Sequence, residues 1–102
     1  MNAEILAIIE QLAREKGIER SILVDALKTA LEAAARKRLP NAENLQCRFN
    51  DETGDIEVLT EKTVVRTVGD LENEIDKKSA SKIVPGIKAG ETVWVPHPLE
   101  DY

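Results

Sequence analysis

The sequence is poor in aromatic residues and lacks an excess of positive charge. Only three of its 102 residues are aromatic, namely Phe49, Trp94 and Tyr102. A surface that stacks nucleic-acid bases needs aromatic side chains, so we do not expect such a platform. The 14 Lys and Arg residues against 19 Asp and Glu residues give a net charge of −5. This balance excludes a protein held on nucleic acid by bulk positive charge, so a polyanion would have to meet a local cationic patch.

The chain also has a single cysteine, Cys47, which excludes an internal disulfide. A lone thiol is typical of proteins in a reducing compartment, and we therefore expect a cytoplasmic protein. Residues 1–11 carry an acidic residue, Glu4, and lack the basic head and the small-residue cleavage site of a secretory signal. No apolar run approaches the roughly 18 residues needed to cross a bilayer, which predicts a soluble protein without membrane contact.

Two amphipathic helices are predicted in the first 38 residues. The first covers residues 2–16, with Asn2 as N-cap and Gly17 as a left-handed stop, because isoleucine and leucine recur at the i, i+3, i+4, i+7 spacing of one helical face. The second starts at Arg20 or Ser21 and ends near Arg38, because Leu39 precedes Pro40 and is pushed out of helical geometry.

The second helix has a predicted buried side and a predicted hydrated side. Its buried stripe is expected to consist of Leu23, Leu27, Ala30, Leu31 and Ala34. Its hydrated side is expected to carry Asp25, Lys28, Glu32 and Arg36.

From Leu45 the hydrophobic period changes to two, which predicts a strand over residues 45–49. The turn NDETGD follows, and residues 56–59 and 62–68 predict two further strands of an antiparallel meander. Residues 69–75 are expected to form a loop. Asp76 is expected to cap a short helix that ends at residue 82 or 83, and a last strand over residues 93–95 is expected to end at Pro96 and Pro98. The prediction is a single α+β domain over residues 1–102, with two packed N-terminal helices, a small antiparallel sheet of about four strands, and a short helix before the last strand.

The sequence offers no set of residues suited to catalysis. His97, the only histidine, stands between two prolines and is expected to be an exposed loop residue. Cys47 lies on the inward phase of its strand, which favours a small buried apolar residue over a reactive thiol. The acidic stretch DETGD lacks the ligand spacing of a calcium loop, and GIKAGET lacks that of a phosphate loop. Trp94 is interpreted as a rim or core aromatic. We therefore expect no enzyme, metal, cofactor or small-molecule substrate.

The stretch EAAARKRLP places Arg36, Lys37 and Arg38 at the end of the second helix. One interpretation is that the cations stabilise the helix terminus, where each gains about 0.3–1 kcal/mol from the helix dipole. The other is that they contact a polyanion. At about 100° per residue they fan around the helix end, and one cation would satisfy the dipole. The pattern alone favours helix-end solvation, because charge runs are usually hydrated.

The order of these segments resembles the N-terminal domain of the bacterial transcription factor NusA. The resemblance is carried by residues 1–38, by DETGDIEV (51–58), by KTVVRTV (62–68) and by EIDKKSASKIVPGIKAGETVWV (74–95), and it covers essentially the whole chain. It implies that the chain ends before a further helix, and that the RNA-binding domains of the full-length protein are absent from it.

The resemblance also implies a function. The family's N-terminal module docks on the flap-tip helix of the polymerase β subunit, near the emerging RNA hairpin, and supports hairpin-dependent pausing, termination and antitermination. On this basis the cationic cluster is expected to make a functional contact, and the expected polymerase or RNA contacts are Arg36, Lys37, Arg38, Lys28 and Glu32. The alternative is a free-standing RNA-binding domain without polymerase contact.

Overall fold

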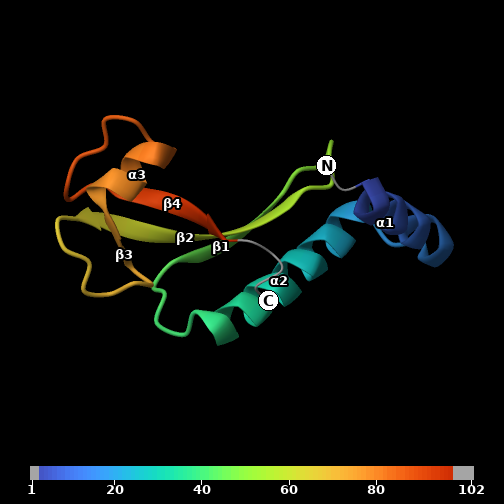
Figure 1. Ribbon diagram of the computed structural model, residues 1–102. Coiled ribbons are helices and arrows are strands. Elements are labelled where there is room, and N and C mark those ends of the chain that lie inside the picture. The colour runs from blue at the N-terminus through green and yellow to red at the C-terminus, as the bar shows by residue number, and fades with distance from the viewer. Residues whose placement is uncertain (1–2, 98–102) are drawn as a thin grey trace.

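The computed structural model describes residues 3–97 and shows an elongated α+β domain of 52 × 27 × 20 Å (Figure 1). Its elements follow in the order α1 (Ala3–Lys16), α2 (Arg20–Arg38), β1 (Leu45–Phe49), β2 (Ile56–Val65), β3 (Glu74–Asp76), α3 (Lys77–Ile83) and β4 (Thr92–His97). The predicted fold class is confirmed. The predicted roles of Asn2 and Pro98 lie outside the described residues. None of the helices in the described part is long and apolar enough to span a membrane.

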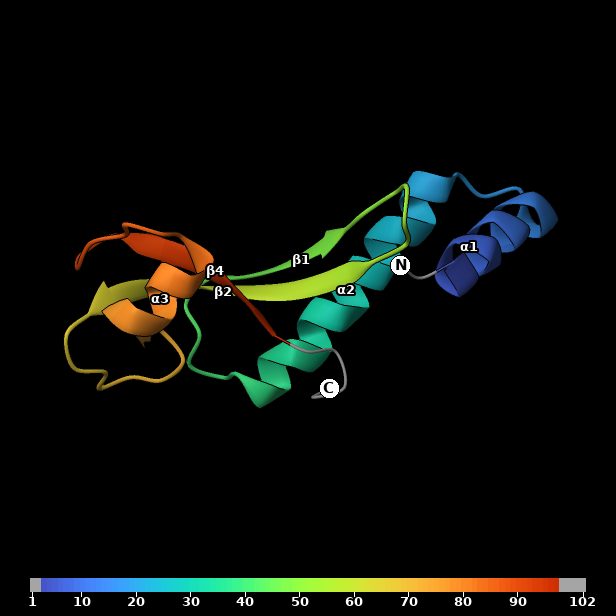
Figure 2. The same cartoon turned by 45° about the horizontal axis from the view of Figure 1, so that its top comes forward.

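The ends of the two long helices are set by local sequence, as predicted. Gly17 adopts a φ of 64°, and the Ile18 N–H donates to the Ala13 carbonyl at 3.2 Å, which closes α1 with a left-handed stop. At the end of α2, Leu39 has a φ of −126°, because the following Pro40 disfavours helical geometry. Figures 1 and 2 show α1 lying beside the beginning of α2, while the rest of α2 runs along the sheet.

The buried face of α2 is rotated from the prediction. Val24 and Ala35 are its buried residues, whereas four of the five predicted positions are half-buried and Ala30 is exposed. The prediction treated α1 as the neighbour of α2, but α2 also packs against β1. For the same reason Lys28 and Glu32, predicted on the hydrated side, are half-buried, while Asp25 and Arg36 on that side are exposed.

The sheet is organised around one long strand. The predicted break between residues 59 and 62 is wrong, because β2 continues from Ile56 to Val65. Thr60 at this point is fully buried, and its hydroxyl is hydrogen-bonded to Nε2 of His97 at 2.7 Å, which makes burial of the polar group tolerable. β2 pairs antiparallel with β1 and β4 and parallel with β3, so the sheet has four strands but is mixed instead of wholly antiparallel.

Two short elements also differ from the prediction. The expected loop over residues 69–75 contains the start of β3, whose three residues are too few to show a period in the sequence. β4 continues through Pro96 to His97, because it pairs only with β2 among the described strands and an edge strand tolerates proline. His97 is therefore a half-buried strand residue and not an exposed loop residue.

The main core lies between α3 and the end of the sheet. It consists of Val64, Ala80, Ile87 and Val93, with Ile75 and Val95 packed against it. Asp76 caps α3 as predicted, since its Oδ2 accepts a hydrogen bond from the Ser79 N–H at 3.0 Å. Cys47 is buried on the inner side of β1, also as predicted.

Candidate functional site

The cationic cluster forms the end of α2, and we call Arg36, Lys37 and Arg38 the α2 tip. All three residues are exposed. Within residues 3–97 none of them takes part in an ion pair. Because the charges remain at the surface, the α2 tip is open to an external polyanion.

The three residues of the α2 tip are not equivalent. Nη1 of Arg36 donates a hydrogen bond to the carbonyl oxygen of Ala42, a buried residue in the connection to β1. One turn earlier, Oε1 of Glu32 accepts a hydrogen bond from the Cys47 N–H at 3.1 Å. Arg36 and Glu32 thus attach α2 to the chain over residues 42–47. Lys37 and Arg38 make no such internal contact in the described part of the chain.

Lys28 lies two turns before the α2 tip, in a different environment. It is half-buried and lines an open depression of about 430 Å³ together with Arg20, Ser21, Val24, Asp25 and Asp51. Burial raises the pKa of the Cys47 thiol, and the nearby carboxylate of Glu32 raises it further, while Lys28 acts in the opposite direction. Of the five predicted contact residues, the structure therefore brings Arg36, Lys37 and Arg38 together and places Lys28 and Glu32 nearer Cys47.

The connection after the α2 tip is held by polar side chains that sequence reasoning missed. The Asn41 N–H donates to Oε2 of Glu72 at 2.7 Å, and Nδ2 of Asn73 donates to the Asn41 carbonyl at 2.7 Å. The Glu43 N–H donates to Oδ1 of Asn73 at 2.8 Å. These bonds join residues about 30 positions apart, and no local signal in the sequence could have indicated them. They fix the α2 tip relative to the sheet.

A second surface feature lies at the other end of α2. Six aliphatic side chains of α1 and α2 line an open apolar groove of about 300 Å³, which we call the α1/α2 groove: Ile5, Ile8, Ile9, Leu12, Leu23 and Leu27. Ile9 is buried, but Ile8 is 56% exposed and Leu12 is 37% exposed. Ile22, beside Leu23 in the sequence, is also 56% exposed. The sequence signal was the helical stripe, which predicted the helices but not an open groove between them.

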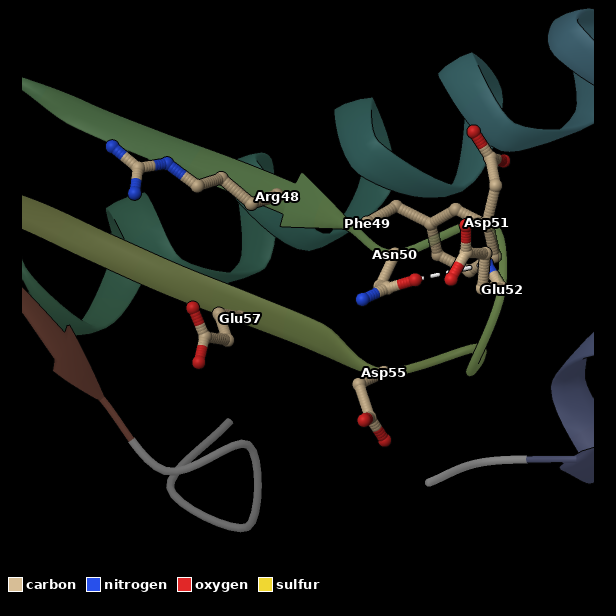
Figure 3. A pocket seen from close by; sticks show the side chains of 7 residues that line it. All are labelled: Arg48, Phe49, Asn50, Asp51, Glu52, Asp55 and Glu57. Carbon is tan, nitrogen blue, oxygen red and sulfur yellow. Dashed lines mark hydrogen bonds between the residues drawn. The ribbon is translucent and has the colours of Figure 1, made fainter.

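The hairpin between β1 and β2 forms a third feature (Figure 3). Its depression is lined by Arg48, Phe49, Asn50, Asp51, Glu52, Asp55 and Glu57. Oδ1 of Asn50 accepts hydrogen bonds from the N–H groups of Glu52 at 2.8 Å and Thr53 at 3.2 Å, and Gly54 has a φ of 78°. These bonds confirm the predicted turn, because Asn and Gly stabilise its backbone without an ion.

Trp94 lies on β4 and is half-buried. The guanidinium carbon of Arg48 is 5.8 Å from the centre of its ring, which is the distance of a cation–π contact. One face of the Trp94 ring is therefore in contact with the Arg48 side chain.

Comparison with known proteins supplies the family. The sequence matches the family described as the NusA N-terminal domain over residues 4–102. It is 36% identical over 93 residues to the transcription termination/antitermination protein NusA of Rickettsia prowazekii, which covers 91% of this chain and 18% of that protein. It is 33% identical over 102 residues to the protein of the same name from Bacillus subtilis, covering 100% of this chain and 28% of that protein.

A solved structure supports the same relationship. The solution structure of the N-terminal domain of NusA from B. subtilis is similar with a TM-score of 0.65 and 34% sequence identity, over 96% of this chain and 79% of that one. The chain spans less than a third of the length of the full-length relatives described above.

Proposed function

The chain belongs to the NusA N-terminal domain family, and on that premise we propose that it is an RNA polymerase-binding module of a bacterial transcription factor. In this proposal it works in the cytoplasm, promotes hairpin-dependent pausing, and takes part in termination and antitermination. It acts by binding and performs no chemistry.

The observation that carries the polymerase contact is the α1/α2 groove. Its aliphatic side chains are left partly open, although burying a Leu or Ile side chain stabilises a protein by about 1.5–3 kcal/mol. Contiguous exposed apolar surface usually marks an interaction site, and a groove between two helices suits the apolar face of a third. The flap-tip helix of the polymerase β subunit, implied by the family resemblance, is the partner we propose.

The α2 tip supports the second contact. Lys37 and Arg38 are exposed and unpaired within the described residues, and both can approach the phosphates of a nascent RNA hairpin. If the module binds the paused complex better than the moving one at both places, the paused state becomes more populated. Arg36 then contributes chiefly by holding the α2 tip in position through Ala42.

A polymerase-binding measurement tests the groove. We expect Ile8→Ser to weaken binding to RNA polymerase by about tenfold, the size of a moderate interface hot spot. Leu71→Ser is the matched control, because Leu71 is 80% exposed and lies outside the groove. Polymerase that lacks the flap tip should bind wild type and Ile8→Ser equally weakly. Full binding to that truncated polymerase would exclude the proposed docking site.

A pausing assay tests the α2 tip. The double variant Lys37→Ala/Arg38→Ala keeps the hydrogen bond from Arg36 to the Ala42 carbonyl. It should reduce hairpin-dependent pause enhancement without lowering the melting temperature. Lys16→Ala, which removes an exposed cation at the end of α1, should leave pausing unchanged. Normal pausing with the double variant would remove the α2 tip from the mechanism, while the groove experiment would still decide the polymerase contact.

A further inference from the structure

Positive charge is concentrated in one segment that the proposed function does not use. Residues 77–90 contain Lys77, Lys78, Lys82 and Lys88 and no acidic residue. Removing these four charges from the total of −5 leaves −9 on the rest of the chain. A protein that is acidic elsewhere therefore has a separate cationic region, distant in sequence from the α2 tip.

The fold turns these lysines outward. Ala80 is completely buried against the core and defines the inner side of α3. At 100° per residue, Lys78 and Lys82 point almost directly away from Ala80, and they lie one turn apart on the same ridge. Lys77 is exposed beside them. Within residues 3–97 none of the four lysine ammonium groups forms a hydrogen bond or an ion pair.

Lys88 and one further cation, Arg66, lie at the same end of the molecule. Val65, the last residue of β2, is paired with Asp76, so the exposed Arg66 follows beside the start of α3. The Gly90 N–H donates to the Val64 carbonyl at 2.8 Å, which brings the turn that contains Lys88 to the same end. Figure 1 shows α3 at the end opposite α1. We call this set the α3 patch, and its members are Arg66, Lys77, Lys78, Lys82 and Lys88.

The carboxylates that flank residues 77–90 in the sequence accept hydrogen bonds from backbone N–H groups. Oε1 of Glu74 accepts hydrogen bonds from the N–H groups of Gly69 at 2.9 Å and Asp70 at 3.0 Å. Asp76 caps α3, and Oε1 of Glu91 accepts from the Lys88 N–H at 2.9 Å. These acids stabilise turns and the helix cap, and within residues 3–97 none of them forms an ion pair with a patch lysine.

We propose that the α3 patch binds the phosphate backbone of RNA. Phosphates are contacted mainly by Lys and Arg, with Ser and Thr as additional donors, and Ser81 lies directly before Lys82 in the sequence. Protein interfaces, by contrast, are depleted in lysine and enriched in aromatic residues, which the patch lacks. Side chains four residues apart on a helix are about 5–6 Å apart at Cβ, a spacing that suits neighbouring phosphates of one strand. A contact to phosphates alone carries no sequence information.

This contact is separate from the one proposed for the α2 tip. The two cationic surfaces lie on different elements. The acidic connection between β2 and β3, which contains Asp70 and Glu72, contacts the chain just after the α2 tip, because Glu72 accepts a hydrogen bond from the Asn41 N–H. The proposal does not depend on polymerase binding, so it can be tested with the chain alone.

The test is a titration of the 102-residue chain with a labelled RNA hairpin carrying a single-stranded tail, at several salt concentrations. Each phosphate contact contributes about 0.7–0.9 to the slope of log K against log salt. The variant Lys77→Gln/Lys78→Gln/Lys82→Gln should therefore reduce that slope by about 2–3. Because these side chains are exposed, its melting temperature should match that of the wild type.

Two control variants make the outcomes distinct. Lys16→Gln removes one exposed cation from α1 and should change the slope by less than one contact. Lys37→Gln/Arg38→Gln measures the α2 tip independently. An unchanged slope in the α3 variant overturns the proposal, whatever the α2 tip variant does. Unchanged RNA binding with weakened polymerase binding would also overturn it, since the patch would then meet an acidic protein surface.

Discussion

The two ends of the molecule bury their apolar side chains to very different degrees. At the sheet end, Val64 is 1% exposed and Ala80 is 0% exposed, in a core shared by α3 and two strands. At the helical end, Ile9 is the buried residue of α1, and Ile8 beside it is 56% exposed. The sheet end contains a closed core, although Ile83 and Val84 beside it are partly exposed, while the helical end leaves most of its aliphatic stripe open.

The radius of gyration shows that the helical end is not folded compactly against the sheet end. The radius of gyration is 16.2 Å, whereas a compact domain of about 100 residues has roughly 13 Å. The difference arises because α1 lies beyond the hairpin end of the sheet, beside the beginning of α2 (Figure 2).

The largest effect is expected from truncating the core at the sheet end. Val64→Ala removes two buried carbons and leaves a cavity, which should lower the free energy of unfolding by about 2 kcal/mol. Ile8→Ala should cost less than about 1 kcal/mol, because the side chain is more than half exposed. Urea denaturation measures both variants. Equal losses would show that the helical end shares the stability of the sheet.

Hydrogen exchange should show the same contrast in the wild-type protein. Amides of α1 should exchange at least about tenfold faster than those of β2, because local opening of a helix with one buried residue costs at least about 1.4 kcal/mol less than global unfolding. Adding RNA polymerase should slow exchange in α1 selectively. Uniform protection throughout the free domain would contradict the distinction between the two ends.

A smaller effect is expected where α2 joins the two ends. Arg36→Ala should lower the free energy of unfolding by about 1 kcal/mol, because it removes the hydrogen bond to the buried Ala42 and that bond is partly screened by solvent. Lys37→Ala should change it by less than about 0.5 kcal/mol. Thermal melts of the two single variants distinguish a positioning arginine from a surface lysine. Equal melting temperatures would remove the structural role of Arg36.

The smallest effect concerns the cap of α3. Hydrogen bonds from the side chain and then the backbone of Ser79 lower the pKa of Asp76 from its ordinary value of 3.8. A carboxyl group with a lowered pKa in the folded state stabilises the fold above its unfolded pKa, and this contribution is lost as the pH falls below about 3.8. NMR of the Ser79 amide during acid titration should show α3 loosening in that range.

The variant Asp76→Asn provides the control for this titration. Asparagine can still cap the helix but does not titrate, so the acid-induced change at Ser79 should disappear. The corresponding change Asp25→Asn, on α2, should leave the Ser79 titration as in the wild type. Persistence of the transition in Asp76→Asn would assign it to another group.

The features that the sequence predicted well are those determined by neighbouring residues. Gly17, the pair Leu39–Pro40 and the cap at Asp76 each act within one helical turn, and all three were placed correctly. The alternation of β1 correctly placed Cys47 inside. These signals need no knowledge of what packs against the element.

The features that the sequence did not predict depend on residues that are distant in the sequence. Nothing near Thr60 indicates that β2 continues, because the burial of that hydroxyl depends on His97, 37 residues later. The rotated face of α2 depends on β1 and not on α1 alone. The exposure of the α2 tip agrees with the sequence interpretation, but the attachment of Arg36 and Glu32 to residues 42–47 became visible only in the fold.

The continuity of β2 has a mechanical consequence. Ten extended residues span about 30 Å, and this strand runs without interruption from the hairpin, where Arg20 of α2 donates to the Asp51 carbonyl, to the start of α3. A sheet strand paired on both edges resists bending much more than a loop does. A partner that binds α1 and α2 would therefore also fix the orientation of the α3 patch at the other end of the molecule.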